Sequence, residues 1–433
     1  MEELKVVAQK VQEQIEKAGA TKARFSLEEK ETQEFNIENG EFSLYRTLFD
    51  KDLSVTVFPE QKKGFASTNK LDDASVQAVV EAAMASAESG IPDEAYDIAP
   101  KQESQSFEIG VYEPDMDLLF ARTRELAEDI KKEFPKIQVM LMMVSHEKNH
   151  EIYWNSNGTE FERFFGSYTF TLEFSANDGE KTTSLAYASV RTKELDRPFI
   201  EMAAVRRQLA DTVKQLDVQP MKGKFTGTVV LMPECVDEFL GYIRSNFISD
   251  SVILEKTSIW LDKLGEQVAD SGVSVRFDPL HEQILSRERY TYDGFVSEAE
   301  DFIKDGVLSS FKTSLYVANK CGVKPAKNSS GCMVMEPGEV SFEDIIKNTK
   351  QGLLLGGFSG GQPGTNGEIS GVAKNSFLIE DGKITKAVNE VMISGNLADM
   401  IKNVVAISKE TLSEGTCVMP YVAVDGVVVS GKE

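Results

Sequence analysis

Histidine and cysteine are scarce in this chain of 433 residues. Only three histidines occur: His146, His150 and His281. Zinc binding and histidine-dependent catalysis can therefore draw on very few side chains. The four cysteines lie far apart, without CxxC spacing: Cys235, Cys321, Cys332 and Cys417. We expect them to be free thiols in a reducing compartment rather than disulfides.

The sequence also lacks a long apolar run and an excess of basic residues. No segment approaches the roughly 18 consecutive apolar residues of a membrane span, and the N-terminus MEELKVVAQK has no apolar signal-peptide core. The net charge is −23, from 47 basic and 70 acidic residues, and such a chain repels phosphate backbones. We therefore predict a cytoplasmic protein that binds neither membranes nor nucleic acid.

Signatures of phosphate binding and of serine catalysis are missing as well. The chain contains no GxxxxGK[ST] loop, no GxGxxG spacing and no GxSxG elbow. His281, in the segment DPLHE, therefore has no such serine to activate. We assign no catalytic residue to this chain from these patterns.

The first half of the chain alternates helical and strand-like patterns. A first helix is predicted to end at Gly19. Its apolar face consists of Leu4, Val7, Ala8, Val11, Ile15 and Ala18. Strand-like runs follow at Ala23–Leu27, Glu34–Ile37, Phe42–Arg46, Leu53–Phe58 and Gly64–Ser67, with a hairpin turn at Asn39-Gly40. A helix at Asp73–Ser89 and a linker around Ile91–Pro114 complete this unit.

The same order then recurs. A helix at Met116–Phe134 precedes strand-like runs at Ile137–Val144, Glu151–Trp154, Phe161–Phe165, Tyr168–Ala176 and Thr182–Ala188, and a helix at Pro198–Leu216 follows. From Lys222 onward short strands dominate, with helices predicted at Glu234–Phe247 and Leu397–Ile407. We predict an α+β fold: two N-terminal helix–antiparallel sheet–helix units, 1–110 and 111–220, followed by a β-rich C-terminal domain, 221–433.

Glycines are concentrated between Gly352 and Gly371, where twenty residues hold eight of the chain's 31 glycines. Glycine is costly to order, so such a cluster indicates positive φ angles or the close approach of another backbone. We predict that a peptide or a partner protein binds this segment. The predicted binding residues are Gly356, Gly357, Gly360, Gly361, Asn366 and Gly367. The alternative is a long surface turn built on Pro363-Gly364 and Asn366-Gly367.

The segment His146-Glu147-Lys148-Asn149-His150 matches HExxH. In zinc peptidases this motif lies on a helix, which places both histidines on one face. Here the flanking runs IQVMLMMVS and EIYWNSNG are strand-like, so we predict that Glu147-Lys148-Asn149 forms a hairpin loop. A self-sufficient metallopeptidase that uses His146 and His150 stays open as an alternative.

The C-terminal half resembles a known family. The segment GLLLGGFSGGQPGTNGEISGVAKNSFLIEDGKITKAVNEVMISGNLADMIKNVVAIS is similar to the C-terminal signature of the TldD/PmbA family, whose members are often labelled as modulators of DNA gyrase. Lys256–Pro279, Tyr292–Phe311 and Pro420–Lys432 also follow the family's order. The resemblance covers roughly 220–433 and implies a barrel-like C-terminal domain.

The resemblance also bears on zinc. The metal-bearing branch of the family, TldD, carries His-Glu-x-x-x-His on the helix that opens this domain and a zinc-binding cysteine near the C-terminus. The matching helix here, Pro233–Tyr242, contains no histidine, and Cys417 alone cannot build a tetrahedral site. Glu234, Asp237 and Glu238 share a helix face that could hold a hard cation, but the helix dipole alone favours acids there.

The chain therefore resembles the TldE (PmbA) branch. That resemblance implies a subunit without its own zinc site or catalytic residues, which binds unfolded peptide beside a metal-bearing TldD-like sibling. Zinc would be held by the sibling, and the chain alone could form a homodimer. The rival from another functional class is a regulator that binds gyrase or another protein without proteolysis.

Overall fold

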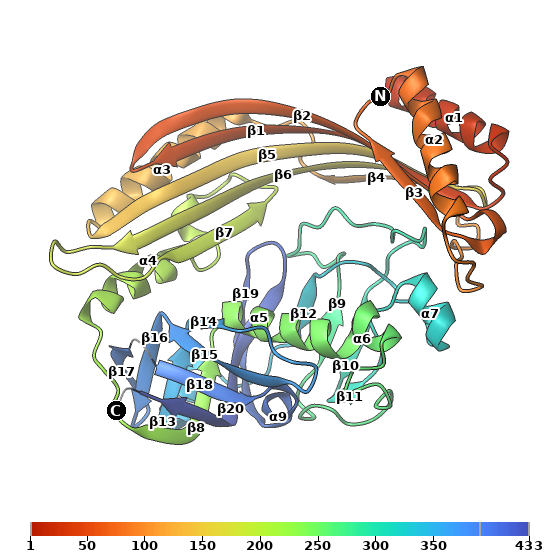
Figure 1. Ribbon diagram of the computed structural model, residues 1–433. Helices are drawn as coiled ribbons and strands as arrows, with labels where there is room; N and C mark the ends of the chain where they lie inside the picture. Colours follow the sequence, from red (N-terminus) through yellow and green to blue (C-terminus); the bar gives the residue numbers. More distant parts are fainter. Residues whose placement is uncertain (1, 389–390, 432–433) are drawn as a thin grey trace.

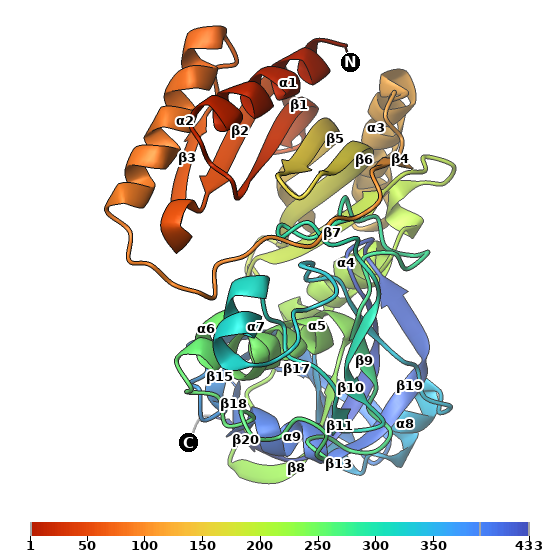
Figure 2. The ribbon, with the colours of Figure 1, turned by 90° about the vertical axis from the view of Figure 1, so that its right-hand side faces the viewer.

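An arched N-terminal sheet stands over a strand-rich C-terminal domain (Figures 1 and 2). The computed structural model describes residues 2–388 and 391–431. This arrangement confirms the predicted α+β fold and the order of its parts. No helix in these two ranges is both long enough and apolar enough to cross a membrane.

Seven strands form the N-terminal sheet, in the order β3-β2-β1-β5-β6-β4 with β7 paired to β6. Their bounds are β1 Ala23–Glu38, β2 Glu41–Val57, β3 Gly64–Thr68, β4 Gln105–Gly110, β5 Ile137–Asn155, β6 Thr159–Ala176 and β7 Ala186–Thr192. The β1–β2 and β5–β6 hairpins lie side by side because β1 also pairs with β5. Strands from 1–110 and from 111–220 thus share one sheet.

The four central strands are longer than the predicted runs. Two predicted runs are parts of β1, and the polar segment between them stays in the ladder. Cross-strand ion pairs account for this, since Glu29 pairs with Lys51 at 2.6 Å and Lys30 with Glu147 at 3.2 Å. The turn at Asn39-Gly40 is confirmed by φ angles of 51° and 84°, which a type I′ turn requires.

Helices cover one face of this sheet at both ends. They are α1 Glu2–Lys17, α2 Asp73–Glu88, α3 Met116–Glu133 and α4 Val205–Lys214, with 3-10 turns at Pro59–Gln61, Phe199–Glu201 and Gln215–Asp217. The predicted apolar face of α1 is confirmed, because Leu4, Val11 and Ile15 are almost fully buried. The predicted helix at Pro198–Leu216 starts late, because Ala203 has a φ of 47° that interrupts it.

The C-terminal domain contains a 13-stranded sheet that curves around α5. Its strands are β8 Lys224–Leu231, β9 Val275–Phe277, β10 Glu300–Lys304, β11 Val307–Leu308, β12 Met333–Met335, β13 Gln351–Leu355, β14 Gly357–Gly360, β15 Glu368–Lys374, β16 Ser376–Glu380, β17 Lys383–Val388, β18 Val391–Asn396, β19 Val404–Ser413 and β20 Val418–Ser430. The last strand, β20, is central and pairs with β8, β12, β18 and β19.

Short helices complete this domain: α5 Pro233–Ile243, α6 Asp250–Leu254, α7 Leu315–Cys321, α8 Phe342–Asn348 and α9 Leu397–Lys402, with a π-helical turn at Arg244–Ile248 after α5. The helix predicted at Leu397–Ile407 is wrong beyond Lys402. Val404 and Ile407 instead belong to β19 and pair with β20, as suits their β-branched side chains. Lys432, the last residue of the predicted segment Pro420–Lys432, lies outside the described residues.

Candidate functional site

A cavity of about 560 Å³ opens between the two domains at the start of α5. We call it the α5 cavity. Its walls come from β7, α4, the first turn of α5, β14 and the segment before β20, and the residues that matter below are Tyr187, Arg207, Gln208, Glu234, Phe358 and Glu414. Figure 1 shows α4 and β7 above β14 and α5 in this region.

The residue types in the first turn of α5 decide which of its side chains faces the cavity. Pro233 stands in the first turn, where its missing N–H costs nothing. Cys235, Val236 and Phe239 are buried in the C-terminal core, so Glu234 is left on the side that faces the cavity. Phe358 of β14 packs edge-on against Phe239 at 5.5 Å between ring centroids, which holds β14 beside the helix.

Arg207 of α4 lies beside the first turn of α5. Arg207 forms an ion pair with Glu234 and lies 3.6 Å from Asp211. These carboxylates raise the pKa of Arg207 despite its burial, so it stays charged. Gln208 also donates to Glu234, at 3.1 Å.

The three acidic residues predicted to share a face of α5 have three different partners. Glu234 pairs with Arg207, Asp237 faces the Cys417 thiol, and Glu238 accepts a 2.6 Å hydrogen bond from Tyr242. Burial raises the pKa values of Asp237 and Glu238. Their carboxylates therefore do not converge on a common point.

Glu414 adds a further acid to the cavity. Burial, together with the charges of Glu234 and Asp237, raises the pKa of Glu414 to about 7. Burial and the neighbouring Asp237 and Glu414 also raise the pKa of the Cys417 thiol well above its usual value. A thiol in this setting stays protonated, whereas a zinc ligand must be a thiolate.

These residues do not fit a zinc ion. Within 2–388 and 391–431, no three histidine, cysteine or acidic side chains are arranged to hold a metal. The α5 cavity contains the Arg207 guanidinium beside Glu234, and the Cys417 thiol beside Asp237 is not among the residues that line it. Zinc chemistry has no donor set here.

The predicted glycine site is split by the structure. Gly356 and Gly357 line the α5 cavity, and a Cβ on Gly356 would lie 2.3 Å from the carbonyl oxygen of Asn375. Gly360 and Gly361 lie at and beyond the end of β14, away from the cavity lining. In the following turn, Gly367 has a φ of 83°, and the carbonyl of Asn366 accepts from Asn396 at 2.8 Å.

The predicted hairpin loop at Glu147-Lys148-Asn149 is wrong. The whole segment lies inside β5, which pairs on both sides along its length. His146 and His150 are four residues apart on a strand and hence about 13 Å apart, too far to share a zinc ion. His146 contacts the carbonyl of Val111 at 2.6 Å, and His150 contacts Glu162 at 3.0 Å.

Arg207 and Glu414 are the residues that sequence patterns missed. Neither belongs to a motif, and they join Glu234 only through the tertiary fold. A weak signal exists for Glu414, which stands three residues before Cys417 in the segment SEGTC. A second interdomain cavity, at Arg24, also carries no motif.

Comparison with known families gives two matches. The PmbA/TldA metallopeptidase C-terminal domain matches residues 223–431, and PmbA/TldA metallopeptidase domain 1 matches residues 23–87. Together these matches cover more than half of the chain.

Similar proteins extend over nearly the whole length. A metalloprotease of Methanocaldococcus jannaschii is 24% identical over 89% of this chain and 90% of its own length. Metalloprotease PmbA of Escherichia coli O157:H7 is 26% identical over 90% of this chain and 88% of its own.

Solved structures share the fold. TldE from Thermococcus kodakarensis superposes with a TM-score of 0.85 at 19% identity and covers 98% of this chain and 100% of its own. A protein from Bacteroides thetaiotaomicron, described as a modulator of DNA gyrase, gives 0.85 at 21% identity with full coverage of both chains. With two family domains in place and this fold around α5, the chain belongs to the PmbA/TldD metallopeptidase family.

Proposed function

We propose that this chain is the non-metal subunit of a TldD/TldE-type peptidase assembly. It binds an extended, unfolded peptide in the α5 cavity and presents it to a metal-bearing sibling subunit. The water, the base and the zinc of the hydrolytic step belong to that sibling.

Two strand edges beside the α5 cavity carry this proposal. In the described part of the chain, β6 is the one strand that pairs with β7, and β15 the one that pairs with β14. On the outer edge of β7 the Arg191 N–H donates to the Glu414 carbonyl at 2.8 Å, so the edge offered to a peptide is the part around Tyr187. Both strands contribute to the cavity wall, β7 through Tyr187 and β14 through Gly357 and Phe358. An extended peptide can add to such an edge through main-chain hydrogen bonds, and Gly357 leaves room for its backbone.

The electrostatics of the cavity suit peptide positioning better than hydrolysis. Arg207 is held between Glu234 and Asp211, so it is not available to activate a water molecule. Glu414, with a pKa near 7, can donate or accept a hydrogen bond to a peptide group. The fold that this chain shares with TldE from Thermococcus kodakarensis supports the same assignment.

The test is a reconstitution with a sibling that carries His-Glu-x-x-x-His. The purified chain should contain substoichiometric zinc by elemental analysis and should not cleave an unfolded peptide alone. Mixed with the sibling, it should co-elute and yield chelator-sensitive cleavage.

A content of one zinc per chain that is lost in a His146→Ala/His150→Ala variant would instead support the hypothesis of a self-sufficient metallopeptidase. Stable binding to gyrase without any cleavage by the mixture would favour the regulator instead.

A further inference from the structure

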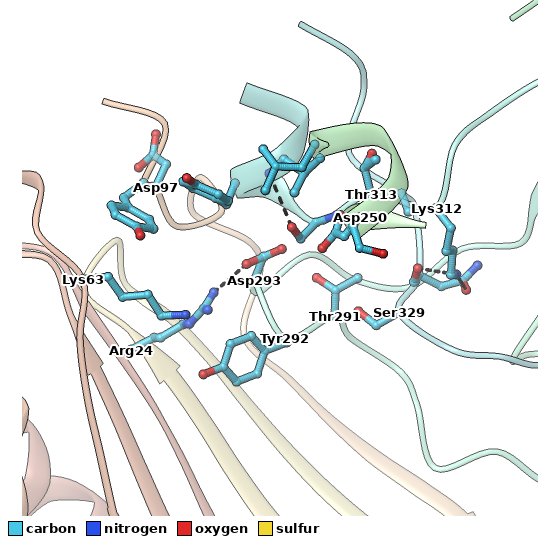
Figure 3. A pocket seen from close by; sticks show the side chains of 18 of the residues that line it. Arg24, Lys63, Asp97, Asp250, Thr291, Tyr292, Asp293, Lys312, Thr313 and Ser329 are labelled. Atoms are coloured by element: carbon cyan, nitrogen blue, oxygen red, sulfur yellow. Dashed lines mark hydrogen bonds and ion pairs between the residues drawn. The ribbon is translucent and has the colours of Figure 1, made fainter. Parts of the chain in front are cut away.

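A second interdomain cavity, of about 600 Å³, lies at Arg24. We call it the Arg24 cavity. The N-terminal part of the chain contributes Arg24, Phe58, Lys63, Tyr96 and Asp97, and the C-terminal domain contributes α6, the start of α7 and the loops around Tyr292 and Asn328. Figure 3 shows these side chains around the opening, with Arg24 and Lys63 on one wall and Asp250 and Lys312 on the opposite side.

Arg24 is buried without enough acceptors. It is only 5% exposed and donates through one terminal nitrogen to Asp293 at 2.7 Å, while its guanidinium stacks on Tyr292 at 3.8 Å. Its Nε has no hydrogen-bond partner, and no acceptor contacts Nη2 among the described residues. A buried guanidinium has five N–H donors and ordinarily finds acceptors for most of them.

Lys63 adds a second positive charge to the same wall. It is exposed, lines the cavity, and forms no ion pair with an acid of the described chain. Lys312, in contrast, already donates to the carbonyl and the side chain of Asn328. Arg24 and Lys63 therefore form the available anion-binding wall.

The rest of the lining limits what kind of anion fits. Asp97 and Asp250 also face the cavity, so a polyanion such as a nucleotide would meet repulsion. Tyr96 and Tyr316 stack at 4.6 Å between ring centroids and supply an aromatic surface. The lining thus offers the N–H donors of Arg24 and Lys63 on one wall, the carboxylate of Asp250 on the opposite side and an aromatic surface, which together match a small zwitterion that has an apolar side chain.

We infer that the Arg24 cavity binds the free α-carboxylate of a short peptide. The carboxylate meets Nη2 of Arg24 and Nζ of Lys63, the α-ammonium is directed to Asp250, and an apolar C-terminal side chain packs on the tyrosines. The volume suits a ligand of a few residues. The peptide nature of the ligand rests on the proposed function, but the site is separate from the α5 cavity.

The experiment is calorimetric titration of the isolated chain, without a sibling, with the tripeptide Gly-Gly-Phe. We expect saturable binding, weakened about tenfold or more when the peptide is amidated at its C-terminus, because one charged hydrogen-bonded contact is lost. The N-acetylated peptide should bind less tightly to the wild type, but Asp250→Asn should abolish that preference.

Variants locate the site. Lys63→Gln should weaken binding about threefold to tenfold, as expected for an exposed charge. Arg24→Lys, which keeps the ion pair with Asp293 but loses the second guanidinium nitrogen, should weaken it more. Lys132→Gln, on an exposed face of α3, is the matched control and should bind like the wild type, and each variant's melting temperature shows whether it is folded.

Equal affinity for the acid and the amide overturns the inference, as does undiminished binding by both folded Lys63→Gln and Arg24→Lys. No binding at millimolar peptide overturns it too. Because the sibling is absent, these results leave the reconstituted cleavage test untouched, so either proposal can fail alone.

Discussion

The two interdomain cavities each contain an arginine paired with a carboxylate, but the surroundings differ. Side-chain exposure is 6% and 16% for Arg24 and Asp293, against 29% and 22% for Arg207 and Glu234. Acids outnumber cations around Arg207, and the pKa of Glu414 is raised, which favours its protonated form. Arg24 itself has N–H donors without an acceptor, at Nε and Nη2, among the described residues. The excess negative charge near Arg207 can be reduced when an acid takes up a proton from solvent. The unpartnered N–H groups of Arg24 instead need a ligand that brings oxygen acceptors.

The largest effect should come from removing the more buried arginine. Arg24→Met leaves the buried Asp293 carboxylate without its cation, with the Leu315 N–H as its remaining donor, and should lower the free energy of unfolding by about 3 kcal/mol. Arg207→Met should cost less, about 1–2 kcal/mol, because that pair is more exposed and Glu234 keeps Gln208. Urea unfolding at pH 7.5 compares the two.

The exposed pair Arg124–Glu128 supplies the control, and Arg124→Met should change stability by less than about 0.5 kcal/mol. In the double variant Arg24→Met/Asp293→Asn, part of the loss should be recovered. A larger loss for Arg207→Met than for Arg24→Met would reverse the comparison.

The pH dependence of stability tests whether protonation of Glu414 reduces the excess negative charge in the α5 cavity. The pKa of Glu414 is about 7 in the folded chain against an ordinary 4.5, so between these values the folded state binds more protons than the unfolded state. Stability should therefore fall as pH rises from 4.5 to 7. Glu414→Gln should remove that part of the slope and be more stable than the wild type at pH 8 by about 1–2 kcal/mol.

Melting curves at several pH values check this. A residual slope should remain, since the pKa values of Asp237 and Glu238 are raised too. An unchanged slope in Glu414→Gln would assign the proton uptake to another group.

The smallest expected effect concerns the glycines at the end of β14, outside the lining of the α5 cavity. A Cβ on Gly360 would lie 2.5 Å from the Phe358 ring and 2.7 Å from the Ser370 carbonyl, whereas a Cβ on Gly361 meets nothing within 4 Å. Gly360→Val should cost about 1 kcal/mol, and Gly361→Val should stay within about 0.5 kcal/mol. Any loss of peptide capture or of sibling binding in Gly361→Val then reports on the surface itself, and normal capture by both variants argues against a binding role.

Local patterns predicted the parts of this fold that local interactions decide. The apolar face of α1 and the Asn39-Gly40 turn depend on neighbours in sequence, and both are confirmed. The strand through Glu28–Gln33 was missed because its polar residues are stabilised by partners across the sheet. The segment at His146 was misread for the same reason.

The candidate site was predictable only in part. Gly356 and Gly357 line the α5 cavity, but their binding of a peptide or partner stays a prediction. The helix predicted at Glu234–Phe247 corresponds to α5 and the π-helical turn that follows it. Arg207, Glu234 and Glu414 meet only when α4, α5 and the segment before β20 pack together. The Arg24–Asp293 pair joins residues 269 positions apart, a contact that no spacing rule in one sequence reveals.

The central position of β20 has a consequence for biosynthesis. β8 is made about 200 residues before β20, yet its ladder with β20 runs from Lys224 to Leu231. At roughly 5–20 residues per second, the β20-facing edge of β8 waits about 10–40 s on the ribosome for that partner. Throughout that interval Val229 and Val230, both fully buried at the end, are exposed on a strand that other nascent chains could pair with. The C-terminal domain can close its core only after β20 has been synthesised.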